Sequence, residues 1–251
     1  MIQLSIVVMT YNEAANIRRC LESVREVADE IVVVDSHSTD ETAVIAEELG
    51  ARVLLRPFQG YMDQRSFSIR SARHDHVLVL DADEALSEAL RASVRAAKAD
   101  WAYDCYWCNR LSSFGGRWIR HGAWYPDRKM RLFDRRCYRV AGIDPHDELL
   151  PAPGAREGRL QGDLLHYPNE DIAHRIEKVN RLSTVAARAY AERGRRGSLL
   201  RVLFKPPVRF LVEYVVRRGF LDGYNGFVIA RSSALYVFLR EAKLLEKRRE
   251  V

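Results

Sequence analysis

The chain has 251 residues, of which 47% are hydrophobic and 29% are charged. This composition is ordinary for a globular protein and excludes a disordered or collagen-like chain. The length is sufficient for one substantial core with a smaller appended element. The four cysteines are too few and too irregularly spaced for a disulfide framework, so we expect reduced thiols in a cytosolic protein.

The net charge of +6 is unevenly distributed. From Arg195 onward there are 13 Lys/Arg against 5 Asp/Glu, whereas residues 1–194 hold 27 basic and 29 acidic residues. Aromatic and aliphatic residues interleave with the basic ones, which favours either a surface for anionic lipid or another polyanion, or a solvated helix face. The slightly acidic first part argues against nucleic-acid binding.

No membrane-spanning or secretory segment is expected. The N-terminus reads MIQLSIVVMTYNE, without a basic leader or a small-residue cleavage site. No stretch reaches the roughly 18 apolar residues that span a bilayer. The longest candidate, near Phe227 to Leu239, is interrupted by Arg231.

The first hundred residues alternate between apolar runs and amphipathic segments. The runs predict strands over residues 4–10, 30–35, 51–57 and 76–83. The segments between them predict three helices. The first covers residues 12–27, with Asn12 as its N-cap, and the second runs from the Ser38–Thr42 turn to Leu49, where Gly50 ends it in a left-handed conformation. The third covers residues 66–73. This alternation predicts an α/β sandwich around a mainly parallel sheet.

The rest of the chain has a different pattern. Residues 86–99 and 172–194 predict helices, and residues 103–134 predict strands with a long loop. Residues 199–247 predict helix with breaks at Pro206-Pro207 and at Gly219–Gly226. We expect a catalytic domain over 1–194 (donor binding in 1–100, acceptor side in 101–194) and a basic helical extension over 195–251.

Polar residues follow three of the predicted strands, where ligands bind in such sheets. They are Thr10, Asn12, Asp35, Ser36, Asp81 and Asp83. Asp81-Ala82-Asp83 places two carboxylates on one strand face, an arrangement that favours Mg²⁺ or Mn²⁺ bound together with a diphosphate. A turn or helix cap is the alternative.

Other segments suggest further roles, each with a plain alternative. Thr10-Tyr11-Asn12-Glu13 and Asp35-Ser36 are suited to binding a nucleoside. The alternative is that Asn12 only caps a helix and Asp35 only forms a turn. His146-Asp147-Glu148, expected in a loop, offers a general base for an acceptor hydroxyl, or is simply exposed. His166 suits a metal or phosphate, or is a hydrogen-bonded histidine near apolar residues. Cys105 and Cys108 have half of a zinc spacing, but the alternation there fits a strand.

The aromatic and basic stretch Arg117–Tyr125 is the candidate acceptor side. It contributes Trp118, Arg120, His121 and Trp124, because indole faces suit sugar rings and guanidinium groups suit phosphates. The alternative is a β-hairpin with surface aromatics. In the tail, Phe204, Phe210, Tyr214, Phe220 and Phe227 with nearby arginines predict peripheral membrane docking or an oligomer interface.

Taken together, the sequence resembles the family-2 glycosyltransferases with a Rossmann-like GT-A fold. The matching segments are LSIVVMTYNEAANIRRCLESV, EIVVVDSHSTDETAVIAEELGARV and VLVLDADEAL. Segments GGRWIRHGAWYPDRKMRLF, PHDEL and GFLDGYNGFVIARSSALYVFLREAKLLE are similar to the subgroup containing lipopolysaccharide-core β-glucosyltransferases. The resemblance covers nearly the whole chain and is most specific in the N-terminal half.

The resemblance implies roles for single residues. The nucleotide-sugar residues would be Thr10, Tyr11, Glu13, Asp35, Arg65, Asp81 and Ala82. Asp83 would ligate the metal, His166 would contact metal or phosphate, and Asp147 would be the base. The chain reads His-Asp-Glu where the subgroup has His-Glu, so the choice between Asp147 and Glu148 stays open.

We therefore expect an inverting enzyme at the inner face of the cytoplasmic membrane. It would transfer a hexose, with UDP-glucose the first guess, to a glycolipid such as lipopolysaccharide core. A lipid-carrier or protein acceptor and a non-catalytic nucleotide-sugar-binding or membrane scaffold protein are alternatives. A nucleotidyltransferase is disfavoured, because no glycine-rich phosphate loop follows the first strand.

Overall fold

The computed structural model describes residues 1–143, 146–168 and 171–246, and the side chains of residues 142–147 fall outside this description. The chain forms two compact units. The first unit comprises Met1–Arg110 and Asp127–Tyr167, and the second comprises Leu111–Pro126 and the chain from Pro168 onward. This division differs from the boundary predicted after residue 194, and the functional assignment of the two parts stays a prediction.

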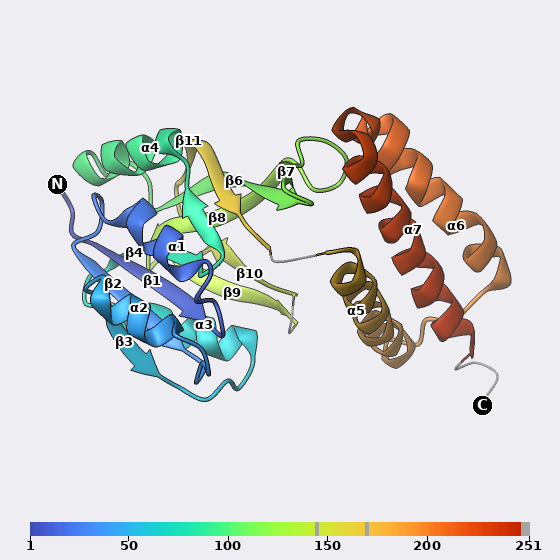
Figure 1. Cartoon of the computed structure of the whole chain (residues 1–251), viewed down its shortest axis with the longest axis horizontal. Helices are drawn as coiled ribbons and strands as arrows, with labels where there is room; N and C mark the ends of the chain where they lie inside the picture. Colours follow the sequence, from blue (N-terminus) through green and yellow to red (C-terminus); the bar gives the residue numbers. More distant parts are fainter. Residues whose placement is uncertain (144–145, 169–170, 247–251) are drawn as a thin grey trace. The chain divides into compact units, whose positions relative to one another are not determined.

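The first unit is built on one mixed sheet (Figure 1). Its strands are β1 (Leu4–Thr10), β2 (Glu30–Asp35), β3 (Arg52–Leu55), β4 (His76–Asp81), β5 (Glu84–Leu86), β6 (Cys105–Phe114), β8 (Asp127–Asp134) and β11 (Glu157–His166). They run in the order β3-β2-β1-β4-β8-β6-β11-β5. The four strands from β3 to β4 are parallel, and β4 pairs with β8 antiparallel. The predicted α/β architecture is confirmed, and an antiparallel half extends it.

Four helices belong to this unit. They are α1 (Ile17–Val24), α2 (Thr42–Glu48), α3 (Tyr61–Arg70) and α4 (Glu88–Ala99). In α1, Ile17, Cys20, Leu21 and Val24 are all buried, which is the spacing of a single apolar helix face. Ser87 caps α4 by accepting a hydrogen bond from the Leu90 amide at 3.2 Å.

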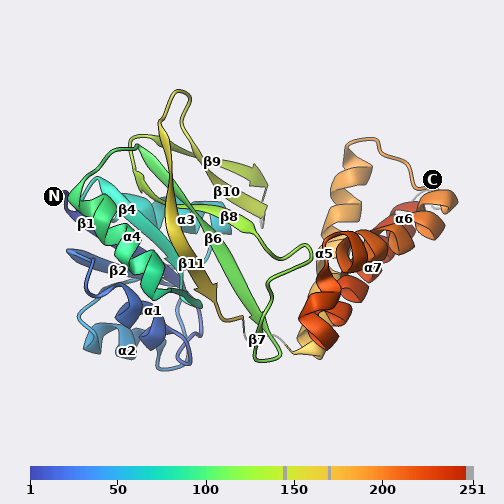
Figure 2. The ribbon, with the colours of Figure 1, turned by 90° about the horizontal axis from the view of Figure 1, so that it is seen from above.

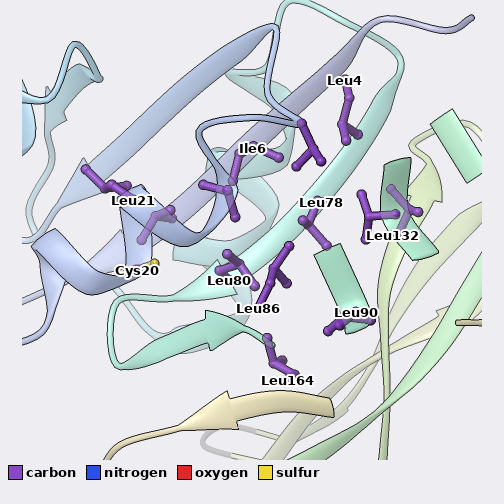
Figure 3. Packing of buried hydrophobic residues seen from close by; sticks show 14 of the residues in the cluster. Leu4, Ile6, Cys20, Leu21, Leu78, Leu80, Leu86, Leu90, Leu132 and Leu164 are labelled. Atoms are coloured by element: carbon purple, nitrogen blue, oxygen red, sulfur yellow. The ribbon is translucent and has the colours of Figure 1, made fainter. Parts of the chain in front are cut away.

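Each face of the sheet carries its own core. Residues of α1, α2 and α4 pack with Leu4, Ile6, Leu78 and Leu80 on one face (Figure 3). On the other face, Val7 and Val79 pack with Ile69 of α3 and with the hairpin formed by β9 (Tyr138–Ile143) and β10 (His146–Pro151). The continuous β-branched runs are explained by this burial on both faces.

Strand β11 returns along α4 and pairs with β5 (Figure 2). Gly162 makes this possible, because a Cβ atom at that position would lie 2.3 Å from the Leu90 amide nitrogen. The β5–β11 register pairs His166 with Glu84, which joins segments far apart in the sequence. The pairing brings the end of β11 to the edge of the sheet at which β4 ends.

The second unit is mainly helical. It contains β7 (Arg117–Trp118), α5 (Ile172–Glu192), α6 (Leu199–Leu211), a π-helix (Val212–Val216), a 3₁₀ turn (Gly219–Asp222) and α7 (Gly223–Glu246). The break predicted at Pro206-Pro207 was wrong, because α6 continues through both prolines. Both lie in an exposed helix, where water can satisfy the carbonyl groups that lose their donors. The break predicted near Gly219 is confirmed.

None of the helices within the described residues is long and apolar enough to cross a membrane.

Candidate active site

The carboxyl ends of β1, β2 and β4 lie side by side, as predicted. Thr10 is opposite Asp35 in the β1–β2 register, and Met9 is opposite Asp81 in the β1–β4 register. The polar residues that follow these strands therefore gather at one edge, because neighbouring parallel strands end together. This edge is the candidate donor site.

The β1–β2 corner contains buried polar atoms that find no partner. Asp35 is fully buried, and its Oδ1 accepts a hydrogen bond from the Ser38 amide at 2.6 Å. Its Oδ2, the Thr10 hydroxyl and Gln64 Oε1 have no hydrogen-bond partner within the described part of the chain. Buried polar atoms are paired in the great majority of native proteins. Three such atoms at one corner could bind a polar ligand such as a nucleoside, and Tyr11 nearby is 58% exposed.

Asn12 does not cap a helix, so that prediction was wrong. α1 begins at Ile17 with Asn16 before it, and Asn12 has a φ of 54° in the left-handed region. Its Oδ1 accepts from the Thr39 amide at 2.7 Å, and its own amide donates to Ser38 Oγ at 2.8 Å. An asparagine tolerates this backbone conformation, and here it joins the loops after β1 and β2 into one wall.

Asp81 lies in a network of arginines. Arg131 Nη2 contacts Asp81 Oδ2 at 3.0 Å, and Arg65 Nη2 lies 3.8 Å from Asp81 Oδ1. Burial alone would raise the pKa of Asp81, but the charges of Arg131, Arg65 and Arg110 hold it well below its usual range. Asp81 is therefore a stable carboxylate, and it stabilises Arg65 at the donor edge.

Glu84 completes this network beneath the site. Its side chain is fully buried, with Arg131 Nη2 at 2.5 Å and Arg110 Nη1 at 3.5 Å. It also accepts a hydrogen bond from the Asp81 amide at 3.1 Å. Neither Glu84 nor Arg131 was identified from the sequence. The available signal was an arginine between Met130 and Leu132 in an apolar strand, which requires a buried anion.

Asp83 faces a different partner from Asp81. β4 ends at Asp81, and Ala82 and Asp83 form a turn, so the alternation argued for a strand does not extend to Asp83. His166 Nε2 lies 3.1 Å from Asp83 Oδ2, and the Tyr167 amide donates to the Asp83 carbonyl at 2.8 Å. The structure thus brings together the two residues that the sequence analysis assigned to the metal.

Glu13 belongs to the same surroundings. Burial raises its pKa, the negative charge of Asp83 acts in the same direction, and a hydrogen bond from Asn16 opposes the shift. The donor set of a carboxylate and an imidazole suits Mn²⁺ or Mg²⁺ when diphosphate oxygens supply the other ligands. Within the described residues no three His, Cys, Asp or Glu side chains form a metal cluster by themselves.

The cysteines are not candidates for metal or nucleophile roles. All four are free thiols, as expected. Burial raises the pKa of Cys108 to about 12 and that of Cys105 to about 11, so both thiols stay protonated at neutral pH. Both lie on β6, as the alternation predicted.

The base candidates lie on β10 and not in a loop, so that prediction was wrong. Residues 146–151 pair antiparallel with β9, in a register that places His146 opposite Ile143 and Pro151 opposite Tyr138. Glu148 is exposed, and Leu149 after it is buried in the core. The side chains of His146 and Asp147 lie outside the described residues, so their roles stay predictions.

The predicted acceptor-side residues belong to the second unit. Trp118 pairs with Ser113 in a short hairpin, as the alternative interpretation stated. His121 Nδ1 contacts Asp222 Oδ1 at 2.9 Å, and the backbone amides of Arg120 and His121 also donate to Asp222. Trp124 carries Arg175 over its ring at 4.8 Å. Ile119 and Trp124 also pack in one apolar cluster with Val228 and Ile229 of α7.

The sequence of this chain is similar to those of known proteins. Residues 5–150 match the family described as Glycosyl transferase family 2. The lipopolysaccharide core biosynthesis glycosyltransferase LpsC of Rhizobium meliloti is 30% identical, over 97% of this chain and 92% of that protein. An uncharacterized glycosyltransferase of Rickettsia bellii is 32% identical, over 97% of this chain and 86% of that protein.

Solved structures share the fold. The mannosyltransferase PcManGT of Pyrobaculum calidifontis, in complex with GDP-Man and Mn²⁺, has a TM-score of 0.53 and 18% identity, covering 99% of this chain and 88% of that one. S. aureus TarS 1-349, in complex with UDP-GlcNAc, has a TM-score of 0.51 and 14% identity, covering 99% and 92%. The chain belongs to glycosyl transferase family 2 and has the GT-A fold.

Proposed function

We propose that the protein transfers a hexose from a nucleotide diphosphate sugar, UDP-glucose first, to a cell-envelope glycolipid such as lipopolysaccharide core. The observation that carries this proposal is the Asp83–His166 pair beside the Asp81–Arg65 ion pair at the end of β4. The name of LpsC supports the lipopolysaccharide acceptor. Thr10, Asp35 and Arg65 would hold the nucleoside and its phosphates.

A divalent cation would be held by Asp83 and His166, with Asp81 kept for Arg65 and Arg131. Such a cation supplies charge neutralisation to a departing diphosphate. Arg65 adds a positive charge to the same edge, and its guanidinium is held in place by Asp81. The protein thus stabilises negative charge where the leaving group develops it.

The acceptor hydroxyl must lose its proton as it attacks the anomeric carbon. Asp147 or Glu148 would take that proton as general base, and a single displacement without a carboxylate nucleophile inverts the anomeric centre. The new glycosidic bond forms as the bond to the diphosphate breaks. Trp118, Arg120, His121 and Trp124 would bind the acceptor.

The donor is tested by thermal shift with UDP-, GDP- and ADP-sugars in Mn²⁺ or Mg²⁺ and then in EDTA. At about 100 times its Kd, a bound nucleotide stabilises the fold by about 2.7 kcal/mol, or roughly 5 to 10 °C in a protein of this size. We expect UDP-glucose to give that shift with metal and to lose most of it in EDTA. No shift with any donor contradicts the proposal and favours the scaffold alternative.

The base is tested by Asp147→Asn and Glu148→Gln. We expect Asp147→Asn to retain the UDP-glucose thermal shift and to lose transfer by about 10²- to 10⁴-fold, because only proton removal is affected. Glu148→Gln, a matched isosteric change on the neighbouring residue, should stay within a few fold. If Glu148→Gln is inactive and Asp147→Asn is active, the general base is Glu148 and not Asp147.

We also propose that the second unit docks on the cytoplasmic face of an anionic membrane. α6 contains no buried residue. Its exposed apolar side chains are Leu199, Leu200, Leu203, Phe204, Val208 and Leu211. Exposed arginines interleave with them, which suits a helix lying in a lipid interface. Of the residues named from the sequence, Phe210 and Tyr214 stack on each other at 5.2 Å between ring centroids and are only partly exposed.

Flotation with vesicles of phosphatidylglycerol or of phosphatidylcholine tests the docking. We expect flotation with phosphatidylglycerol at low salt, reduced by salt and abolished in Leu203→Asp/Phe204→Asp. Val44→Asp, on an exposed apolar residue of α2, is the matched control and should float normally. If the double variant changes the oligomeric mass while flotation is equal for both lipids, the surface is a homo-oligomer interface instead.

A further inference from the structure

A pocket of about 400 Å³ lies in the first unit. It is lined by Trp107, Cys108, Asn109, Arg128, Glu157, Gly158 and Arg159. These residues come from three neighbouring strands, β6, β8 and β11. None of them is a donor-site, base or acceptor-side residue named above.

A β-bulge positions one wall of the pocket. The β6–β8 register passes from Tyr106↔Leu132 to Trp107↔Met130, so Arg131 is the extra residue. The bulge sends Arg131 into the Glu84 network and leaves Trp107, Asn109 and Arg128 beside the pocket, with Asn109 directly opposite Arg128. Bulges commonly re-aim side chains next to functional sites.

The opposite wall depends on Gly158. A Cβ atom there would lie 2.6 Å from the Tyr103 ring and 2.9 Å from the Tyr106 ring, so only glycine lets β11 approach this closely. Glu157 and Arg159 flank it and lie on the other side of the strand. Glu157 Oε2 accepts a hydrogen bond from Trp107 Nε1 at 2.7 Å, which fixes the orientation of the indole.

The pocket offers two cationic groups and one buried hydrogen-bond acceptor. Arg128 and Arg159 have no ion pair or hydrogen bond to a side chain within the described residues, and the nearby Glu157 is engaged by Trp107. Asn109 Oδ1 is buried and finds no donor in the same part of the chain. Both guanidinium groups are exposed and can take up an anion, whereas a buried carbonyl oxygen requires a donor.

We infer that this pocket binds an anionic sugar, a pyranose that carries a phosphate or a carboxylate. The anionic group would be held by Arg128 and Arg159, a sugar hydroxyl would donate to Asn109 Oδ1, and the ring would lie on the Trp107 indole. The pocket is on the sheet face that also carries the β9–β10 hairpin, since Trp107 and Val140 pack against the same core. The binding of an anionic sugar to this pocket does not depend on the proposed function. Only the assignment of that sugar to the acceptor of the transfer reaction rests on it.

The test observes the four tryptophan indole N–H signals of the ¹⁵N-labelled full chain by NMR, with Trp107 identified by Trp107→Phe. Glucose 6-phosphate, glucuronate, glucose, inorganic phosphate and UDP are titrated separately, without metal. We expect glucose 6-phosphate or glucuronate to shift the Trp107 signal with a Kd of about 1 mM, and glucose or phosphate alone to bind at least about tenfold more weakly. Which of the two sugars binds more tightly identifies the anionic group.

Arg128→Gln/Arg159→Gln should weaken this binding by at least about tenfold. Arg70→Gln/Arg139→Gln removes the same charge from two exposed arginines of the first unit and should leave it unchanged. The inference is overturned if Trp107 does not respond to either anionic sugar, if both double variants behave alike, or if UDP shifts Trp107 equally. Because no donor or turnover is involved, that failure is distinct from failure of the proposed transfer.

Discussion

Asp83→Ala should reduce sugar transfer by about 10³-fold or more, measured as kcat/KM with a saturating acceptor. Among the described residues Asp83 contacts His166 and no arginine, whereas Asp81 is paired with Arg65 and Arg131. In the proposed function its loss would remove a bound cation worth several kcal/mol of transition-state stabilisation, and each 1.36 kcal/mol is a factor of ten. The nucleotide thermal shift of the variant should also become insensitive to EDTA.

The fold of this variant should be intact. The Asp83 side chain is 22% exposed and contacts His166, which is not part of the hydrophobic cores. Asp100→Ala, on an exposed aspartate after α4, is the control and should transfer sugar normally. Turnover of Asp83→Ala similar to the wild type would remove the metal assignment, even if the protein proved to be a glycosyltransferase by other means.

Arg131→Met should lower the free energy of unfolding by about 3–5 kcal/mol, measured by urea denaturation. The Glu84 carboxylate is fully buried, and without Arg131 its remaining ionic partner is Arg110 at 3.5 Å. Removing one partner of a buried ion pair leaves an uncompensated charge, which is far more costly than losing the pair. Arg139→Met, at an exposed arginine of β9, should stay within about 0.5 kcal/mol.

A double variant separates two contributions to the lost free energy of unfolding, the unpaired buried charge of Glu84 and the loss of packing at Arg131. Arg131→Met/Glu84→Leu should recover a large part of the lost stability, because both buried charges are then absent. If the double variant is as unstable as the sum of the single changes, the two side chains act independently. Arg131→Met should also weaken donor binding, since Asp81 loses one of the charges that keep its pKa low.

The sequence predicted the first half of the sheet well. Strands β1, β2 and β4 are continuous runs of β-branched and aliphatic residues, and a chain that buries both sheet faces needs such runs. Helix α1 was predicted by the spacing of its four buried residues, although its beginning was not. Asparagine is a residue type that often caps helices. Only the structure shows that the side chain of Asn12 instead accepts a hydrogen bond from the Thr39 amide in the neighbouring loop.

The strands of the antiparallel half of the sheet were harder to predict from the sequence, for a physical reason. In β6, β8 and β11 polar and charged residues interrupt the apolar ones, and the pairing of these strands depends on which strand lies beside them. Local pattern cannot specify partners far away in the sequence, and β-propensity depends on cross-strand neighbours. The strand nature of 146–151 was missed in the same way, because its partner β9 defines it.

The sequence by itself determined the fold family, the sheet edge at which polar residues gather, and the types of side chain found there. These follow from apolar runs and from the polar residues at their ends, both of which are local. Only the tertiary structure decided that Asp83 meets His166, that Asp81 is neutralised by Arg131 and Arg65, and that Glu84 lies buried beneath them. Those contacts depend on the β5–β11 pairing and on the β8 bulge, and the energy of a charge depends on the groups that surround it after folding.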